Sequence, residues 1–243
     1  MGKAKPMLRF QLRDQLPADL IFIAANIGIV VILMIITHVT GDASGSYTSI
    51  GLSTGIYMLV IASVGLRSSL RLGAQLGVSR NRCFGDFVLS LILSSFALAI
   101  TIEIVLSVFS AATASSGMCH FTDLFAMLYL GELDAGALSL SQHLLSTIFN
   151  LCIILFCPAI GAIFSMLFWR LNRLGRTILV ILLIAIPFCF PMFLVYSLST
   201  HLPALFFFVG KPTNVMAVLL LSAVVLFFLS WLLSRTVHIR PGK

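Results

Sequence analysis

The sequence predicts an all-α, polytopic membrane protein with six transmembrane helices and both termini in the cytoplasm. Apolar residues, with Tyr and Cys included, make up 60% of the 243 residues, and charged residues make up only 9%. Mean hydropathy is +1.12. A soluble domain carries about 25% charged residues, so this chain needs lipid around it. The placement of Lys and Arg, described below, supports the count of six.

A transmembrane helix needs about 20 mostly apolar residues. One domain, residues 1–243, holds six such segments: 19–37, 50–66, 84–110, 143–168, 177–199 and 214–234. The second is short, and its Gly51 and Gly55 form a GxxxG pattern that allows close helix approach. That contact is either a dimer seam or an internal one.

Basic residues set the orientation. All of the 15 Lys and Arg residues except Lys211 fall in the N-terminal segment, the second and fourth loops and the C-terminal tail. Because Lys and Arg concentrate in cytoplasmic loops, these four segments are predicted to lie on the cytoplasmic side. The net charge of +7 therefore reflects membrane orientation, and nucleic acid is not an expected partner.

The N-terminal segment has an amphipathic pattern. Leucines four residues apart, from Leu8 to Leu16, share one helical stripe, and Arg9 and Arg13 share another. Pro17 is expected to break the helix just before the first span. The pattern predicts a helix lying in the cytoplasmic interface, with a simple basic anchor as the alternative.

The second loop has the most informative pattern. Gly73 and Gly77 permit a sharp reversal, and Ser79 can cap the helix that becomes the third span. The element is either a docking surface for a cytoplasmic partner or a hairpin held by phospholipid headgroups. Its arginines are Arg67, Arg71, Arg80 and Arg82.

The run LGVSRNRCF at residues 76–84 resembles the GxSR…F turn between spans two and three of small bacterial ABC-2 type permease subunits. The overall layout is also similar. The resemblance implies a transport subunit that pairs with a second, identical or homologous permease, each resting on a separate cytoplasmic ATPase. ATP and Mg²⁺ would bind that ATPase, so no cofactor is expected in this chain.

Residue roles follow from the same resemblance. The coupling loop would comprise Arg67, Arg71, Gly77, Ser79, Arg80 and Arg82, and a second cytoplasmic contact would comprise Arg170, Arg173 and Arg176. One feature departs from many ABC-2 permeases, because the large external segment, 111–142, lies between spans three and four. This departure favours the smaller drug or peptide exporters.

The external segment is expected to contain a short helix on the outer leaflet. Asp123 is expected to lie off its apolar face. The helix would either cap an exit path or form a packed lid. The apolar face comprises Phe121, Leu124, Phe125, Leu128 and Tyr129.

Polar residues and prolines within the spans are candidates for function. Glu103 and Asn150 lie at similar depths and are expected to face one another or a central path; alternatively, Glu103 reaches water near the outer interface. Pro187 and Pro191 predict a kink in the fifth span, which is either a hinge or a static bend.

Other site classes have little support. The five cysteines lack paired spacing, so neither a disulfide framework nor a zinc site is indicated. The outer histidines fit an interfacial position better than a metal site. The sequence has no P-loop, HExxH or GxSxG motif, which makes an enzyme the least supported class.

The sequence thus predicts the permease subunit of an ATP-driven exporter in a bacterial plasma membrane. It would move a hydrophobic or amphipathic peptide, antibiotic or drug by alternating access. The alternative is the substrate-capture subunit of a vitamin or micronutrient importer, which is also small and lacks an ATPase.

Overall fold

The computed structural model describes residues 4–40, 50–114, 123–130, 139–172, 174–175, 177 and 210–235. The elements in this part of the chain are all α-helices. They are α1 (Ala4–Thr40), α2 (Ile50–Gln75), α3 (Arg80–Ala114), α4 (Leu124–Tyr129), α5 (Leu140–Arg170) and α8 (Pro212–Arg235).

Five of these helices are long and apolar enough to cross a membrane: α1, α2, α3, α5 and α8. They correspond to five of the six predicted spans. Nearly all of the predicted span 177–199, with Pro187 and Pro191, lies outside the described residues. Residues Arg173 and Arg176 lie outside them too.

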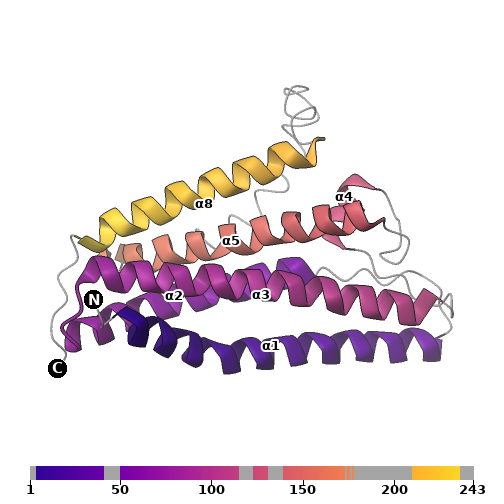
Figure 1. Cartoon of the computed structure of the whole chain (residues 1–243), viewed down its shortest axis with the longest axis horizontal. Helices are drawn as coiled ribbons and strands as arrows, with labels where there is room; N and C mark the ends of the chain where they lie inside the picture. The colour runs from indigo at the N-terminus through magenta and orange to yellow at the C-terminus, as the bar shows by residue number, and fades with distance from the viewer. Residues whose placement is uncertain are drawn as a thin grey trace.

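The long helices run side by side (Figure 1). α2 packs on α3 and α5, α5 also packs on α8, and α1 packs on α3 at the edge of the bundle. The start of α1, the α2–α3 turn and the ends of α5 and α8 gather at one end of the bundle (Figure 1), which we call the arginine-rich end. α4 and the start of α8 lie at the opposite end.

Small residues set the closest helix contact, between α2 and α5. A Cβ at Gly161 would overlap the Leu59 carbonyl oxygen, and a Cβ at Gly51 would overlap Asn150 Oδ1. A Cβ at Gly55 would lie 2.9 Å from Cys157 Sγ. The GxxxG pattern therefore makes an internal contact, which was one of its two predicted roles.

A stripe of polar residues holds α1 against the bundle. Gln11, Gln15, Asp19 and Asn26 lie within roughly 80° of one another on a helical wheel of 3.6 residues per turn. The same helix otherwise presents many apolar side chains outward. Since lipid is as apolar as those side chains, hydrogen bonds and close packing, such as that of Phe22 on Tyr57, fix α1 in place rather than a hydrophobic driving force.

Three sets of contacts from this stripe reach α2 and α3. Gln11 Nε2 donates to Ser69 Oγ. Asp19 accepts from Tyr57 Oη at 2.8 Å and from Ser94 Oγ at 3.0 Å. Asn26 Oδ1 accepts from Ser53 Oγ at 3.1 Å. The contacts therefore run from the arginine-rich end well along α1.

The predicted break at Pro17 is wrong, because α1 continues through it. Proline removes one backbone donor, a loss that packed membrane helices tolerate. The contacts of Gln11 and Asp19, on either side of the proline, hold the helix in line. The segment is also no separate interfacial helix, since Met7 and Gln11 are buried while Leu16 is 56% exposed.

We expect Gly161→Ala to lower the free energy of unfolding by about 1–3 kcal/mol, because the added methyl meets backbone. Gly28→Ala is the matched control, since nothing lies within 4 Å of its Cβ position. Unfolding in mixed micelles, followed by circular dichroism, measures both. Equal stability of the two variants would contradict the tight α2–α5 contact.

Candidate functional site

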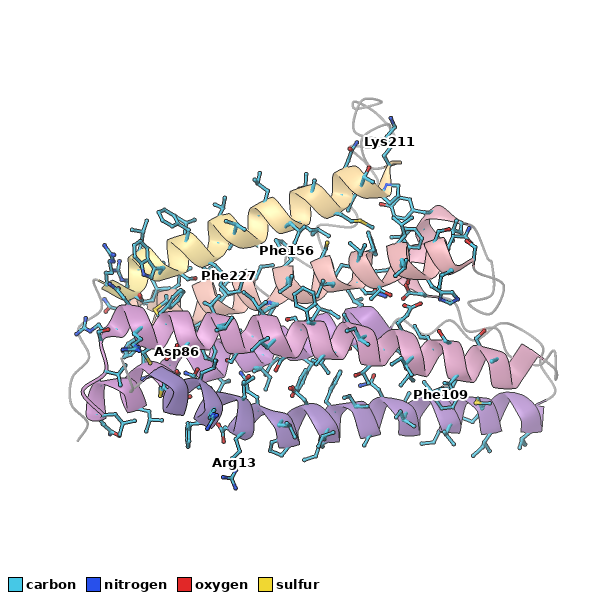
Figure 2. The ribbon with its side chains drawn as sticks, in the orientation of Figure 1. Arg13, Asp86, Phe109, Phe156, Lys211 and Phe227 are labelled. Atoms are coloured by element: carbon cyan, nitrogen blue, oxygen red, sulfur yellow. The ribbon has the colours of Figure 1, made fainter. Side chains whose placement is uncertain are left out.

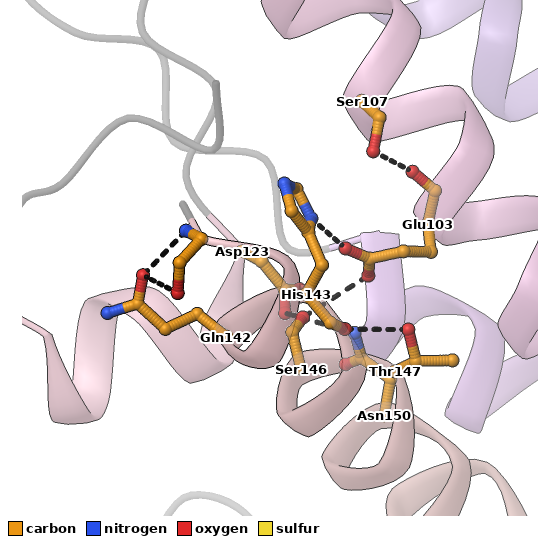
Figure 3. A network of polar contacts seen from close by, with 9 residues as sticks. Glu103, Ser107, Asp123, Gln142, His143, Ser146, Thr147 and Asn150 are labelled. Carbon is orange, nitrogen blue, oxygen red and sulfur yellow. Dashed lines mark hydrogen bonds and ion pairs between the residues drawn. The ribbon is translucent and has the colours of Figure 1, made fainter. Parts of the chain in front are cut away.

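A network of polar side chains (Figure 3) lies beside α4, which stands at the end of the bundle opposite the arginines (Figure 1). Glu103 comes from α3, Asp123 from the residue before α4, and the other members from α5. We call this network the polar cluster. Its members are Glu103, Asp123, His143, Ser146 and Asn150.

Hydrogen bonds connect all five members. His143 Nδ1 lies 2.7 Å from Glu103 Oε1. Ser146 Oγ lies 3.2 Å from Glu103 Oε2 and 2.5 Å from Asp123 Oδ2. Asn150 Nδ2 donates to the same Asp123 oxygen at 3.0 Å. The cluster is therefore one chain of contacts across α3, α4 and α5 (Figure 3).

Local structure explains how the cluster is assembled. His143, Ser146 and Asn150 share one face of α5, since they are spaced three and four residues apart. A capping box begins this helix, with the Ser139 backbone N–H donating to Gln142 Oε1 at 2.8 Å. The absence of a side chain at Gly51 leaves room for the Asn150 amide.

The inner part of the cluster is dry and only partly satisfied. Asp123 is 2% exposed, and Ser146 and Asn150 are fully buried. Asp123 Oδ1 and Asn150 Oδ1 are buried without a hydrogen-bond partner. Because an unpartnered buried oxygen is costly, these two atoms mark a place where a proton or a ligand donor would be favoured.

α4 covers the cluster and packs on α5. Phe125 and Tyr129 of α4 lie 5.7 Å from the Phe149 ring, measured between centroids. Burial raises the pKa of the Tyr129 phenol. The predicted short helix is thus present, but the expectation that Asp123 lies off its packed face is wrong, since Asp123 points into the bundle.

The predicted pair, Glu103 and Asn150, belongs to this single cluster, bridged by Ser146 and Asp123. Sequence reasoning missed the parts played by His143 and Asp123. It also missed the role of Asp19, which begins the first predicted span and joins α1 to α2 and α3. The spacing of Gln11, Gln15 and Asp19 was the signal that could have identified the last of these.

At the arginine-rich end, α2 and α3 form a tight hairpin. α2 extends to Gln75, nine residues beyond its predicted end at 66. Gly77 has φ of +69°. The Val78 N–H donates to the Gly73 carbonyl at 2.8 Å, and the Gly77 N–H donates to the Ala74 carbonyl at 3.3 Å. This is a Schellman motif, and it confirms the predicted reversal at Gly77.

Further contacts fix the hairpin. The Ser79 carbonyl accepts from the backbone N–H groups of Arg82 and Cys83, so Ser79 stands at the start of α3; a cap by its side-chain hydroxyl stays a prediction. Cys83 Sγ donates to the Ser69 carbonyl at 3.0 Å. Gly73 has a different role from Gly77: it lies within the last turn of α2, and a Cβ there would be 2.6 Å from Cys83 Sγ.

The structure joins the hairpin to the end of α5. The Arg67 and Arg71 guanidinium groups lie 5.6 and 6.0 Å from the centre of the Trp169 ring. Arg170 Nη2 donates to the Leu233 carbonyl of α8 at 3.4 Å. The first predicted cytoplasmic contact and the described part of the second, Arg170, therefore form one surface. Arg80 and Arg82 are exposed beside the turn.

A cavity of about 730 Å³ lies beside this hairpin, between the start of α1 and the C-terminal half of α2. It has both charged and apolar lining, including Asp14, Arg71 and Phe87. No group of three His, Cys, Asp or Glu side chains in the described ranges could hold a metal ion. Cys83, Cys152 and Cys157 are free thiols.

We expect Asp123→Ala to loosen α4, because it removes two hydrogen bonds worth about 1 kcal/mol each. Cys152 is 1% exposed and lies with Phe125 in the apolar core between α4 and α5. It should then react with N-ethylmaleimide roughly tenfold faster. Peptide mass spectrometry measures this, with buried Cys83 as internal reference. Leu128→Ala, on the exposed face of α4, is the control; equal acceleration in both variants would contradict the role of Asp123.

Comparisons with protein-family models, with curated proteins and with solved structures found no match to this chain.

Proposed function

We propose that this chain is the membrane-spanning subunit of an exporter driven by a separate ATPase. In this proposal residues 177–199 supply a further span, the fifth in chain order, which brings the total to six, and the arginine-rich end faces the cytoplasm with both termini. A second permease subunit, identical or homologous, completes the path. The substrate is hydrophobic or amphipathic, such as a peptide, an antibiotic or a drug.

The observation that carries the proposal is the fixed hairpin at the arginine-rich end. A motor protein can move a membrane helix only through an element stiff enough to transmit force. The Schellman turn at Gly77 and the contacts of Cys83 with Ser69 supply that stiffness. The cation–π contacts of Arg67 and Arg71 with Trp169 extend it to α5.

Charge supports the proposed orientation. Basic residues are common at the arginine-rich end, whereas Lys211 lies at the opposite end (Figure 2). Arg82 and Arg235 are both exposed at the arginine-rich end. The positive-inside rule then favours the cytoplasm for this end, where exposed guanidinium groups would suit an acidic groove on an ATPase.

The polar cluster favours the alternative, a substrate-capture subunit of a vitamin importer, because such a subunit needs polar groups near its outer face. The cavity of about 730 Å³, however, lies at the arginine-rich end. Trp169 and the arginines around it also have no part in that alternative. We therefore favour the exporter.

Reversing the charge of the hairpin should release the ATPase. We expect Arg82→Glu to reduce the ATPase that co-purifies with the chain by about tenfold or more, because like charges at an interface cost several kcal/mol. The variant should still fold, since an acidic residue suits the first turn of α3. Quantitative mass spectrometry of the affinity-purified complex from native membranes measures the effect.

Arg13→Glu is the matched control. Arg13 is exposed on α1 and points away from the bundle (Figure 2), so the same charge change should leave the ATPase bound. Equal loss in both variants would indicate a general charge effect and contradict docking at the hairpin. Absence of any ATPase from the wild-type complex would refute the exporter, and a co-purified vitamin would establish the alternative.

A further inference from the structure

Ser146 lies between two carboxyl groups, and its hydroxyl has only one proton. Its Oγ is 2.5 Å from Asp123 Oδ2 and 3.2 Å from Glu103 Oε2. A serine hydroxyl donates one hydrogen bond and accepts up to two. If Ser146 donates to Asp123, the contact with Glu103 is a hydrogen bond only when Glu103 carries a proton and donates it to Ser146.

The charges around the cluster agree with an extra proton. Among the described residues, the only ion pair of either carboxyl group is the contact of His143 with Glu103. Two ionised carboxyl groups beside at most one cation, His143, would leave at least one negative charge without compensation next to the buried Ser146 and Asn150, which is strongly unfavourable. A proton on one of the two removes that cost and completes the hydrogen bonds of Ser146.

We infer that Glu103, Ser146 and Asp123 form a proton relay that opens to solvent at His143. In one step, Glu103 Oε2–H passes its proton to Ser146 Oγ while the Ser146 proton moves to Asp123 Oδ2. Glu103 becomes a carboxylate and Asp123 a carboxylic acid. His143 first takes a proton from hydronium at Nε2 and becomes an imidazolium; it then gives its Nδ1 proton to Glu103 at Oε1 and returns to the neutral imidazole, with water as the other product.

Exposure falls along the proposed relay. The side chain of His143 is 25% exposed and that of Glu103 is 15% exposed. Ser146 is fully buried, and Asp123 is 2% exposed. The relay therefore leads from solvent to Asp123, beside the unpartnered oxygens of Asp123 and Asn150. A proton delivered there would change the charge that this part of the bundle presents.

The other groups near the relay neither carry the shared proton nor compensate the charge of the two carboxyl groups. α2 presents Gly51 and Thr54 at this level, neither of which titrates. α4 presents Tyr129, whose raised pKa keeps the phenol neutral. α5 adds the buried thiol of Cys152, and α8 begins beside the exposed Lys211.

Infrared spectroscopy of the full chain in lipid bilayers tests the relay, because a protonated carboxyl group has a C=O stretching band that ionised carboxylates lack. At neutral pH we expect one such band from the shared proton, and we expect both Glu103→Gln and Asp123→Asn to abolish it. Asp86→Asn, at the other end of the bundle (Figure 2), and Asp19→Asn identify any unrelated band. Gel filtration and circular dichroism confirm folding of each variant.

The outcomes separate the proposal from its rivals. Loss of the band in only one of the two cluster variants would show two independent carboxyl groups and overturn the shared proton. Absence of the band from wild type across the neutral range would overturn it as well. His143→Ala should keep the band but slow its appearance after a pH jump by at least about tenfold; an unchanged rate would refute His143 as the entry point. None of these readouts depends on an ATPase partner.

Discussion

The bundle depends on one constraint, which is that polar groups inside lipid must find partners on other helices. No water is present to replace a missing hydrogen bond, and apolar side chains gain little by leaving lipid for a neighbouring helix. Specificity therefore comes from a few polar contacts. Asp19, joined to Tyr57 and Ser94, fixes the position of α1. Asp123, joined to Ser146 and Asn150, fixes α4 on α5.

The two ends of the bundle differ in chemistry, yet the same pair of helices serves both. α2 carries Gly51 beside the polar cluster and Arg71 at the arginine-rich end. α5 carries Asn150 and Trp169 in the same two places. Since small residues hold the two helices in close contact along their length, they form one stiff unit. A tilt of that unit would therefore move the polar cluster and the arginine-rich end together.

Composition and hydropathy were sufficient to predict an all-helical membrane fold and each of the five long apolar helices that the structure describes. The turn at Gly77 was also predictable, since glycine is the residue that best tolerates a left-handed conformation. The continuous helix at Pro17 and the buried position of Asp123 were not predictable, because both depend on contacts with α2 and α5 that no local pattern contains. The arginines after residue 66 suggested a loop. Packing of this segment on Cys83 and Trp169 keeps it helical as the last part of α2. The pairing of His143 with Glu103 was not predictable either, because 40 positions separate them in the sequence.

The close contact of α2 with α5 has a consequence for how the chain is made. About 65 residues separate the end of α2 from the start of α5. At about 5–20 residues per second of translation, α2 waits roughly 3–13 seconds in the membrane before its main neighbour emerges from the ribosome. During that interval its glycine face must be covered by lipid or by the insertion machinery, and α5 must displace that cover when it arrives.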